Sequence, residues 1–159
     1  MKKTMKRQEV IELSGKFERL KASSIKLAWS IVQDINKNCE SLKNYVKDMI
    51  GVESKMMEDY NKKRDAICIS FAKKDKNGKP IFITTQGAKR YDISDENKDE
   101  FKKAFDALRE ESTDLFSERE KFLNEEIEIG LKSIKQGVIP DGLVVEAWQG
   151  DVLMSMIEE

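Results

Sequence analysis

The stretch that decides the fold is Ala28–Met56, which reads AWSIVQDINKNCESLKNYVKDMIGVESKM. Because seven residues make about two turns of an α-helix, apolar residues that repeat every seven positions share one side of it. Such a repeat predicts a long amphipathic helix here. The repeating positions are Ala28, Ile35, Leu42, Met49 and Met56.

The same periodicity extends in both directions from this stretch. Phe17 is in phase with its start, and Ile67 and Phe71 continue it at the other end. We therefore predict one long helix, or two helices in series, over residues 17–72. Gly51 permits a break, since glycine costs about 1 kcal/mol relative to alanine inside a helix.

A turn and a small hairpin follow the long helix. The dipeptide Asn77-Gly78 is a strong turn signal, and residues 80–93 then read as a β-hairpin. An alternative pairs residues 66–71 with residues 80–85 across the Asn-Gly turn.

Three further elements are predicted downstream. Residues 95–123 have helical spacing and begin with acidic residues, which the helix dipole favours. Residues 125–131 alternate apolar and polar side chains, as a half-buried strand does. Residues 143–157 are predicted to form a short C-terminal helix.

A second strand is predicted near the N-terminus at residues 8–14, with 9–13 as the segment that would pair with 125–131. At ~1.5 Å per residue, the 17–72 helix would be roughly 84 Å long and the 95–123 helix about 44 Å. The two strands would then meet only if the first helix breaks or if they pair between chains; otherwise they stay unpaired.

These elements predict an α+β fold in a single domain, residues 1–159. Its main part is a long antiparallel helical hairpin or a three-helix bundle. A small β-sheet or hairpin and a short C-terminal helix complete it.

Charge is distributed unevenly along the chain. Residues 1–90 carry 21 basic and 11 acidic side chains, a net of +10, whereas residues 91–159 carry 8 and 19, a net of −11. Two interpretations stay open: the halves fold against each other as complementary surfaces, or each half offers a patch to a partner.

The composition argues against most catalytic chemistry. There is no histidine, which removes Ser-His-Asp triads, Cys-His dyads and histidine-ligated zinc. Cys39 and Cys68 are not spaced as a metal site or a redox pair. We therefore expect no cofactor, no metal and no enzymatic activity; a hydrolase that uses carboxylates alone is the remaining enzymatic hypothesis.

A basic region with an interleaved tyrosine surrounds the predicted hairpin. Lysine and arginine can bind phosphates while aromatic rings stack on bases, so the region is a candidate contact for nucleic acid or for a protein partner. The alternative is a charged, solvated hairpin without a ligand. The candidate residues are Lys73, Lys74, Lys76, Lys79, Lys89, Arg90 and Tyr91.

The long helix has more apolar stripe than the shorter second helix can cover. A second copy of the chain could bury the remainder, so the sequence predicts a homodimer. The candidate oligomer seam is Ile35, Leu42, Met49 and Met56.

A Lys-Asp-x-x-Gly turn, a short hairpin, and a helix that leads into a Leu-Asn-Glu-Glu strand follow one another along the chain. The matching segments are Lys74–Gly78, Gly87–Ser94, Glu100–Leu108 and Leu123–Ile129. This order resembles a family of small uncharacterised phage proteins, over about half of the chain. The resemblance implies a phage or prophage origin. The family has no assigned activity, so no functional residue is transferred.

These observations together favour a non-enzymatic, phage-encoded protein that binds a host protein, such as a host defence protein or a host enzyme. The alternative is a nucleic-acid-binding protein that uses the basic region at 73–90. The segment Gln8–Leu13 is too polar for a signal peptide core, and no run is apolar enough to span a membrane. We therefore expect a location in the host cytoplasm.

Overall fold

The computed structural model describes residues 1–85, 87–139 and 142–157, and it divides into two compact units. The core unit consists of Met1–Val52 and Glu120–Glu159, and the hairpin unit consists of Glu53–Arg119. The fold is α+β, with helices, two small two-stranded antiparallel sheets and a short C-terminal helix, which confirms the predicted class. The expectation of a single domain stays a prediction.

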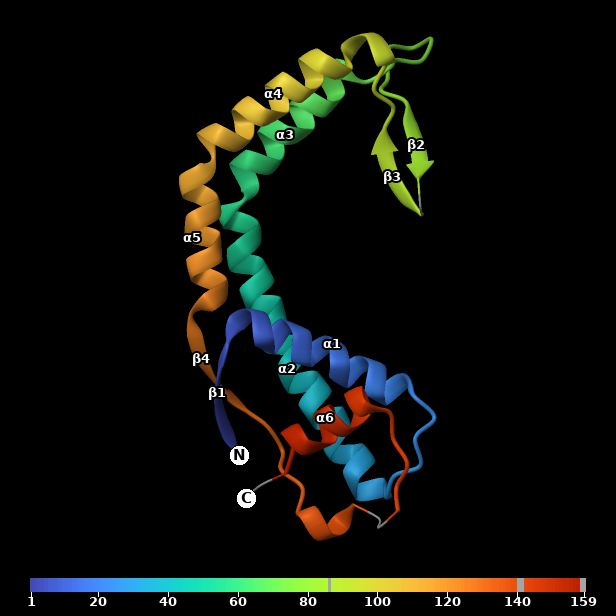
Figure 1. Cartoon of the computed structure of the whole chain (residues 1–159), viewed down its shortest axis with the longest axis vertical. Helices are drawn as coiled ribbons and strands as arrows, with labels where there is room; N and C mark the ends of the chain where they lie inside the picture. Colours follow the sequence, from blue (N-terminus) through green and yellow to red (C-terminus); the bar gives the residue numbers. More distant parts are fainter. Residues whose placement is uncertain (86, 140–141, 158–159) are drawn as a thin grey trace. The chain divides into compact units, whose positions relative to one another are not determined.

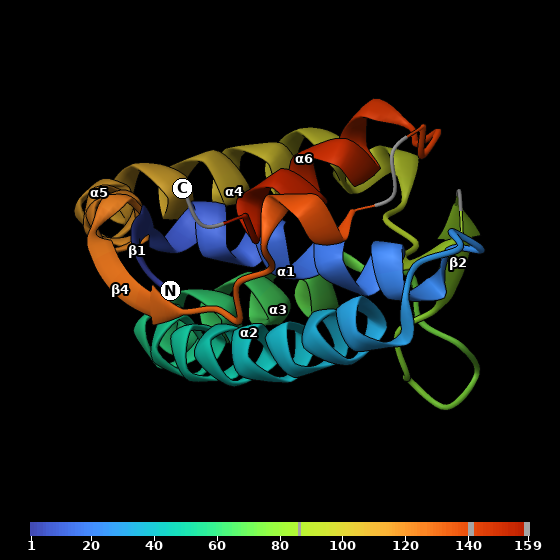
Figure 2. The same ribbon diagram turned by 90° about the horizontal axis from the view of Figure 1, so that it is seen from below.

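The core unit is built from helices that cover a two-stranded sheet (Figure 1). Figures 1 and 2 both show the C-terminal helix lying beside the first helix. The main elements of the core unit are β1 (Lys2–Lys6), α1 (Arg7–Ala22), the larger part of α2 (Trp29–Met56), β4 (Glu126–Gly130) and α6 (Ala147–Ser155).

The predicted strand at residues 8–14 is wrong, because this segment lies in α1. Its apolar residues recur every three or four positions, so they share one side of a helix, and that side is buried. The strand that pairs with β4 is β1, antiparallel, with Lys2 opposite Gly130 and Lys6 opposite Glu126. The predicted strand at 125–131 is thus confirmed as β4, and it pairs within one chain.

The prediction of one long helix, or two helices in series, over 17–72 is also wrong, because these residues belong to three helices. The chain leaves the helical conformation at Ser23, where φ is −79° and ψ is 158°, and α2 starts only at Trp29. A second interruption lies at Met57, and α3 (Glu58–Phe71) follows it. The break that Gly51 would permit does not occur there, since Gly51 lies inside α2.

Hydrophobic packing in the core unit involves all its main elements. Fifteen described hydrophobic side chains form one buried cluster there, from helices α1, α2 and α6 and from the segment that begins with β4. The buried Asn38 is satisfied within it: its Nδ2 donates to the carbonyl of Lys132 (3.0 Å), and its Oδ1 accepts from the N–H of Lys132 (2.6 Å). Leu42, predicted to be a core residue, is fully buried.

The hairpin unit pairs α3 with α4 (Lys98–Glu111), which follows the short helix η1 (Asp95–Asn97). A further helix, α5 (Thr113–Asn124), begins in this unit after an interruption at Ser112, so the predicted 95–123 helix is divided. Between α3 and η1 lie β2 (Phe82–Thr85) and β3 (Ala88–Tyr91), which confirm the predicted hairpin at 80–93.

Aromatic contacts and ion pairs hold the helices of the hairpin unit together. The ring centroids of Tyr60 and Phe116 are 5.0 Å apart, and those of Phe71 and Phe101 are 6.0 Å apart.

The alternative, in which residues 66–71 pair as a strand with residues 80–85, is wrong, because residues 66–71 are helical.

Ion pairs within each unit join the basic first half of the sequence to the acidic second half. Lys2 pairs with Glu128 in the core unit at 2.7 Å, and Lys63 pairs with Glu111 in the hairpin unit at 2.6 Å. These contacts support the view that the two halves complement each other in the fold.

Two smaller expectations have mixed outcomes. The C-terminal helix exists but is shorter than the predicted 143–157, because α6 covers only Ala147–Ser155.

In the described part of the chain, no helix is both long and apolar enough to cross a bilayer.

Candidate interaction site on the hairpin

The base of the β2–β3 hairpin is fixed by three backbone hydrogen bonds that form a ring. The N–H of Lys73 donates to the carbonyl of Asp92 (2.7 Å), and the N–H of Asp92 donates to the carbonyl of Ile81 (2.9 Å). The N–H of Ile81 donates back to the carbonyl of Lys73 (2.7 Å). The hairpin is therefore tied to the end of α3 through the main chain.

A tight turn, residues 74–80, precedes the hairpin and is called the lysine turn here. One carboxylate oxygen of Asp75 accepts the backbone N–H groups of Asn77 (2.8 Å) and Lys79 (2.9 Å). Gly78 has φ of +75°, a conformation that side-chain-bearing residues rarely adopt. The turn is thus locally well defined, and its three lysines are exposed.

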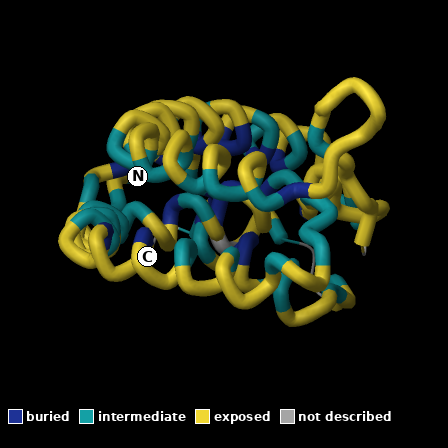
Figure 3. Tube along the Cα trace, turned by 90° about the horizontal axis from the view of Figure 1, so that it is seen from above, coloured by how far each residue is buried: buried dark blue, intermediate teal, exposed yellow. Residues whose placement is uncertain are grey.

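The register of the hairpin assigns its side chains to two faces. Phe82 is opposite Tyr91 and Thr84 is opposite Lys89 on one face, while Ile83 is opposite Arg90 on the other. Figure 3 shows the described residues of the lysine turn and the hairpin as largely exposed. The exposed fractions are 36% for Ile81, 41% for Phe82 and 45% for Ile83.

The aromatic rings of the hairpin contact each other. The ring centroids of Phe82 and Tyr91 are 4.6 Å apart, and the Nζ of Lys89 lies 4.2 Å from the centroid of Phe82. Phe82 therefore already has an aromatic and a cationic neighbour within the hairpin.

The electrostatics of this end of the unit are mixed. Lys73 is paired with Asp92 at 3.1 Å, whereas the other predicted cations make no ion pair within the described residues. Directly after the hairpin, Asp95 pairs with Lys98, and this hydrogen bond lowers the pKa of the Asp95 carboxyl. Free cations thus lie close in sequence to an acidic helix start.

The structure brings only part of the predicted basic region together. Lys89, Arg90 and Tyr91 are consecutive on β3, and Lys73 is at the hairpin base. Lys74, Lys76 and Lys79 lie in the lysine turn, which Figure 1 shows at the opposite end of the hairpin from the β2–β3 connection.

Sequence reasoning missed the apolar side of this site. The predicted candidate residues were basic side chains and Tyr91, whereas Ile81, Phe82 and Ile83 are also exposed beside them. The signal was present: the run Ile81–Thr85 contains no charged residue and does not alternate between apolar and polar side chains.

The predicted oligomer seam is not a surface in this structure. Ile35, Leu42 and Met49 belong to the buried cluster of the core unit, and Met56 is half-buried. The physical reason is the turn at 23–28, which lets α1 fold back and contribute to the same cluster as α2. The homodimer itself stays a prediction, but it needs another surface.

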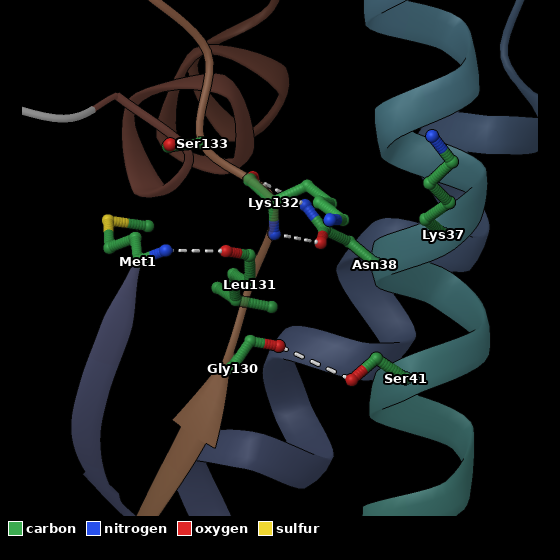
Figure 4. Close-up of a pocket in the computed structure, with 8 residues that line it drawn as sticks. All are labelled: Met1, Lys37, Asn38, Ser41, Gly130, Leu131, Lys132 and Ser133. Carbon is green, nitrogen blue, oxygen red and sulfur yellow. Dashed lines mark hydrogen bonds between the residues drawn. The ribbon is translucent and has the colours of Figure 1, made fainter.

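A pocket of about 440 Å³ in the core unit is the alternative place for a ligand (Figure 4). Several of its polar groups already form hydrogen bonds within the fold. The terminal amine of Met1 donates to the carbonyl of Leu131 (3.0 Å), Ser41 donates to the carbonyl of Gly130 (3.3 Å), and both amide atoms of Asn38 are used as described above. The pocket is therefore a poorer candidate than the hairpin.

Neither cysteine has the lowered pKa of a reactive thiol. Burial raises the pKa of the Cys39 thiol, and burial also raises that of Cys68, so both favour the neutral thiol. Among the described residues, no group of three or more cysteine, aspartate or glutamate side chains is placed to hold a metal ion.

Comparisons with known proteins give no further assignment. No protein-family model, no curated protein and no solved structure matches this chain. The resemblance to small phage proteins therefore stays an expectation from the sequence.

Proposed function

We propose that this chain is a protein-binding protein whose recognition element is β3 together with the lysine turn. The partner is a protein with an acidic surface, and the phage resemblance makes a host protein its expected source. The observation that carries this proposal is a set of exposed cations, on β3 and in the lysine turn, that make no ion pair within the described residues; the hairpin they flank is tied to the end of α3. The residues concerned are Lys74, Lys76, Lys79, Lys89 and Arg90.

The mixed charge of this region favours a protein over a nucleic acid. A phosphate backbone presents one sign of charge along its whole length, and acidic side chains such as Asp95 and Glu96 close to the hairpin would repel it. Protein surfaces mix both signs, so a basic strand next to an acidic helix start can be complementary to them.

The aromatic contacts point the same way. Proteins that bind single strands offer open aromatic faces on which bases stack. Here Phe82 is in contact with Tyr91 and Lys89, and the whole chain has a net charge of −1. Neither feature favours capture of a polyanion.

Nucleic-acid binding is the second candidate, because the unpaired cations could each contact a phosphate. Five such contacts would give a log–log slope of affinity against salt of about −4 to −5, at about 0.9 per phosphate. Fluorescence anisotropy with short single-stranded and duplex oligonucleotides, read at several salt concentrations, tests this candidate directly.

The test of the main proposal compares two charge-reversed proteins in capture from a nuclease-treated host lysate. The first carries Lys89→Glu and Arg90→Glu, on β3. The second carries Lys16→Glu and Lys47→Glu, an equal change of charge at two exposed lysines of the core unit. Captured proteins are identified by mass spectrometry.

The proposal expects one protein that wild type and the Lys16/Lys47 variant capture equally and that the Lys89/Arg90 variant loses at least tenfold. Equal capture by all three proteins contradicts the assignment of the site to β3. Capture that is seen in a parallel untreated lysate but not after nuclease treatment, together with steep salt dependence in the anisotropy experiment, replaces the proposal with the nucleic-acid candidate.

A further inference from the structure

The two outer edges of the β2–β3 hairpin differ in chemistry. β3 carries Lys89 and Arg90, and charged residues on an edge strand oppose pairing with another strand. β2 and the residue before it carry no charge over Ile81–Thr85, and their side chains are exposed. β2 is also the strand farther from α3 and α4 in Figure 1.

The register shows which backbone groups of β2 are free. In an antiparallel pair, residues alternate between positions bonded to the opposite strand and positions directed away from it. The N–H of Asp92 donates to Ile81, which places Ile81 and Ile83 in the bonded set. Phe82 and Thr84 therefore direct their N–H and C=O groups to the outer edge, where no strand of the described chain pairs with them.

We propose that the outer edge of β2 pairs with β2 of a second copy of this chain. The two copies then share a four-stranded antiparallel sheet in the order β3-β2-β2-β3, with a two-fold axis at Ile83. Phe82 of each copy lies opposite Thr84 of the other, and these residues exchange four backbone hydrogen bonds. The axis brings the two Ile83 side chains together.

Charge and symmetry favour a second copy of this chain as the partner of the β2 edge. A two-fold interface requires a surface that is complementary to itself, and an uncharged edge meets this condition without like-charge contacts. Pairing through β3 would instead bring the Lys89 and Arg90 side chains of both copies together. The β2 edge also accounts for the exposed Ile81 and Ile83, which an isolated two-stranded hairpin leaves in water.

This inference is independent of the proposed function, because it uses the opposite edge of the hairpin. In the dimer, Lys89 and Arg90 lie on the outer strands and stay available to an acidic partner. A failure of dimerisation therefore leaves the partner site untouched, and a failure of partner capture leaves the dimer untouched.

The first test is disulfide cross-linking of Ile83→Cys. Opposite residues on one face of an antiparallel pair have Cβ atoms ~4.5–5.5 Å apart and are closest at non-hydrogen-bonded positions, which Ile83 occupies on the two-fold axis. Mild oxidation should give a covalent dimer on a non-reducing gel. The control is Arg90→Cys, on β3 opposite Ile83. It should give no more covalent dimer than wild type, whose background is set by Cys39 and Cys68.

The second test keeps the hairpin's own hydrogen bonds intact. Thr84→Pro removes an N–H that points away from β3, a position where edge strands tolerate proline, and should abolish dimerisation. Lys89→Pro makes the same change on the outer edge of β3 and should preserve the dimer. Light scattering over a range of concentrations measures the mass of each variant.

The proposal expects the mass of wild type to rise from 18.4 kDa toward twice that value as concentration increases. A wild-type mass that stays at 18.4 kDa at every concentration overturns it. Dimers that survive Thr84→Pro, or that cross-link equally well through Arg90→Cys, also overturn it, since both results place the interface elsewhere.

Discussion

The core unit and the hairpin unit use their side chains in opposite ways. In the core unit, fifteen described hydrophobic side chains are buried in one cluster. In the hairpin unit, the only described buried residues are Ala72, Leu108 and Ser112, and the helices meet through half-buried aromatic rings and ion pairs. The first arrangement buries much apolar surface, and the second leaves the hairpin exposed.

This difference matters because free energy of unfolding scales with the apolar surface removed from water. A pair of helices joined by edge-on aromatic contacts buries less of it than three helices packed over a sheet. Binding surfaces are commonly found in such less stable regions, which is consistent with a site on the hairpin.

The largest expected effect comes from the same substitution made once in each unit. Leu42→Ala should lower the free energy of unfolding by about 2–5 kcal/mol, because its fully buried side chain leaves a cavity. Leu108→Ala should cost less, about 2 kcal/mol, because half-buried neighbours can move into the space. Urea denaturation measures both, and equal losses would contradict the comparison.

A medium effect is expected for the buried amide of the core unit. Asn38→Ala leaves the N–H and the carbonyl of Lys132 without their partner, and an unsatisfied buried group costs about 1–3 kcal/mol. The control is Asn36→Ala, on the same helix and half-buried, whose side chain makes no comparable hydrogen bonds to the described residues. If the two variants have the same midpoint in urea, the bridge contributes nothing.

The smallest effect concerns the glycine of α2. Gly51→Ala should raise the free energy of unfolding by up to about 1 kcal/mol, because alanine is the better helix former and no atom lies within 4 Å of the new Cβ. Gly78→Ala provides the contrast, since φ of +75° makes it destabilising. Thermal unfolding measures both, and destabilisation by Gly51→Ala would mean that α2 is interrupted there.

How much the sequence predicts depends on the unit. The heptad spacing of Ile35, Leu42 and Met49 correctly identifies the buried side of α2, since a long periodic pattern is a strong signal. The strand at 125–131 and the hairpin at 80–93 follow from clean alternation and from turn residues. All of these are local patterns that need no knowledge of the partner segment.

The sequence-based predictions are wrong where contacts between distant segments determine the secondary structure. Val10 and Leu13 are compatible with a short strand, and only the continuation to Phe17 and Leu20 shows the helical side that α1 buries. The turn at 23–28 contains no proline or glycine that would indicate a turn. Missing that turn produced both the overlong helix and the expected oligomer seam.

The candidate site was predicted in composition but not in arrangement. The basic residues at 73–90 are visible in the sequence, whereas the ion pair between Lys73 and Asp92 and the contact of Lys89 with Phe82 depend on the hairpin register. That register also decides which edge of the hairpin is uncharged, so the distinction between the β2 and β3 edges required the structure.

We infer that the core unit is the more stable of the two and that the hairpin unit, which carries the proposed interaction site, is the less stable. Native-state hydrogen exchange in increasing denaturant tests it directly, because it gives an opening free energy for each amide. We predict that amides of α1 and α2 in the core unit exchange only through global unfolding, while those of α3, β2 and β3 exchange through a smaller opening. Equal opening free energies in both units would contradict the account.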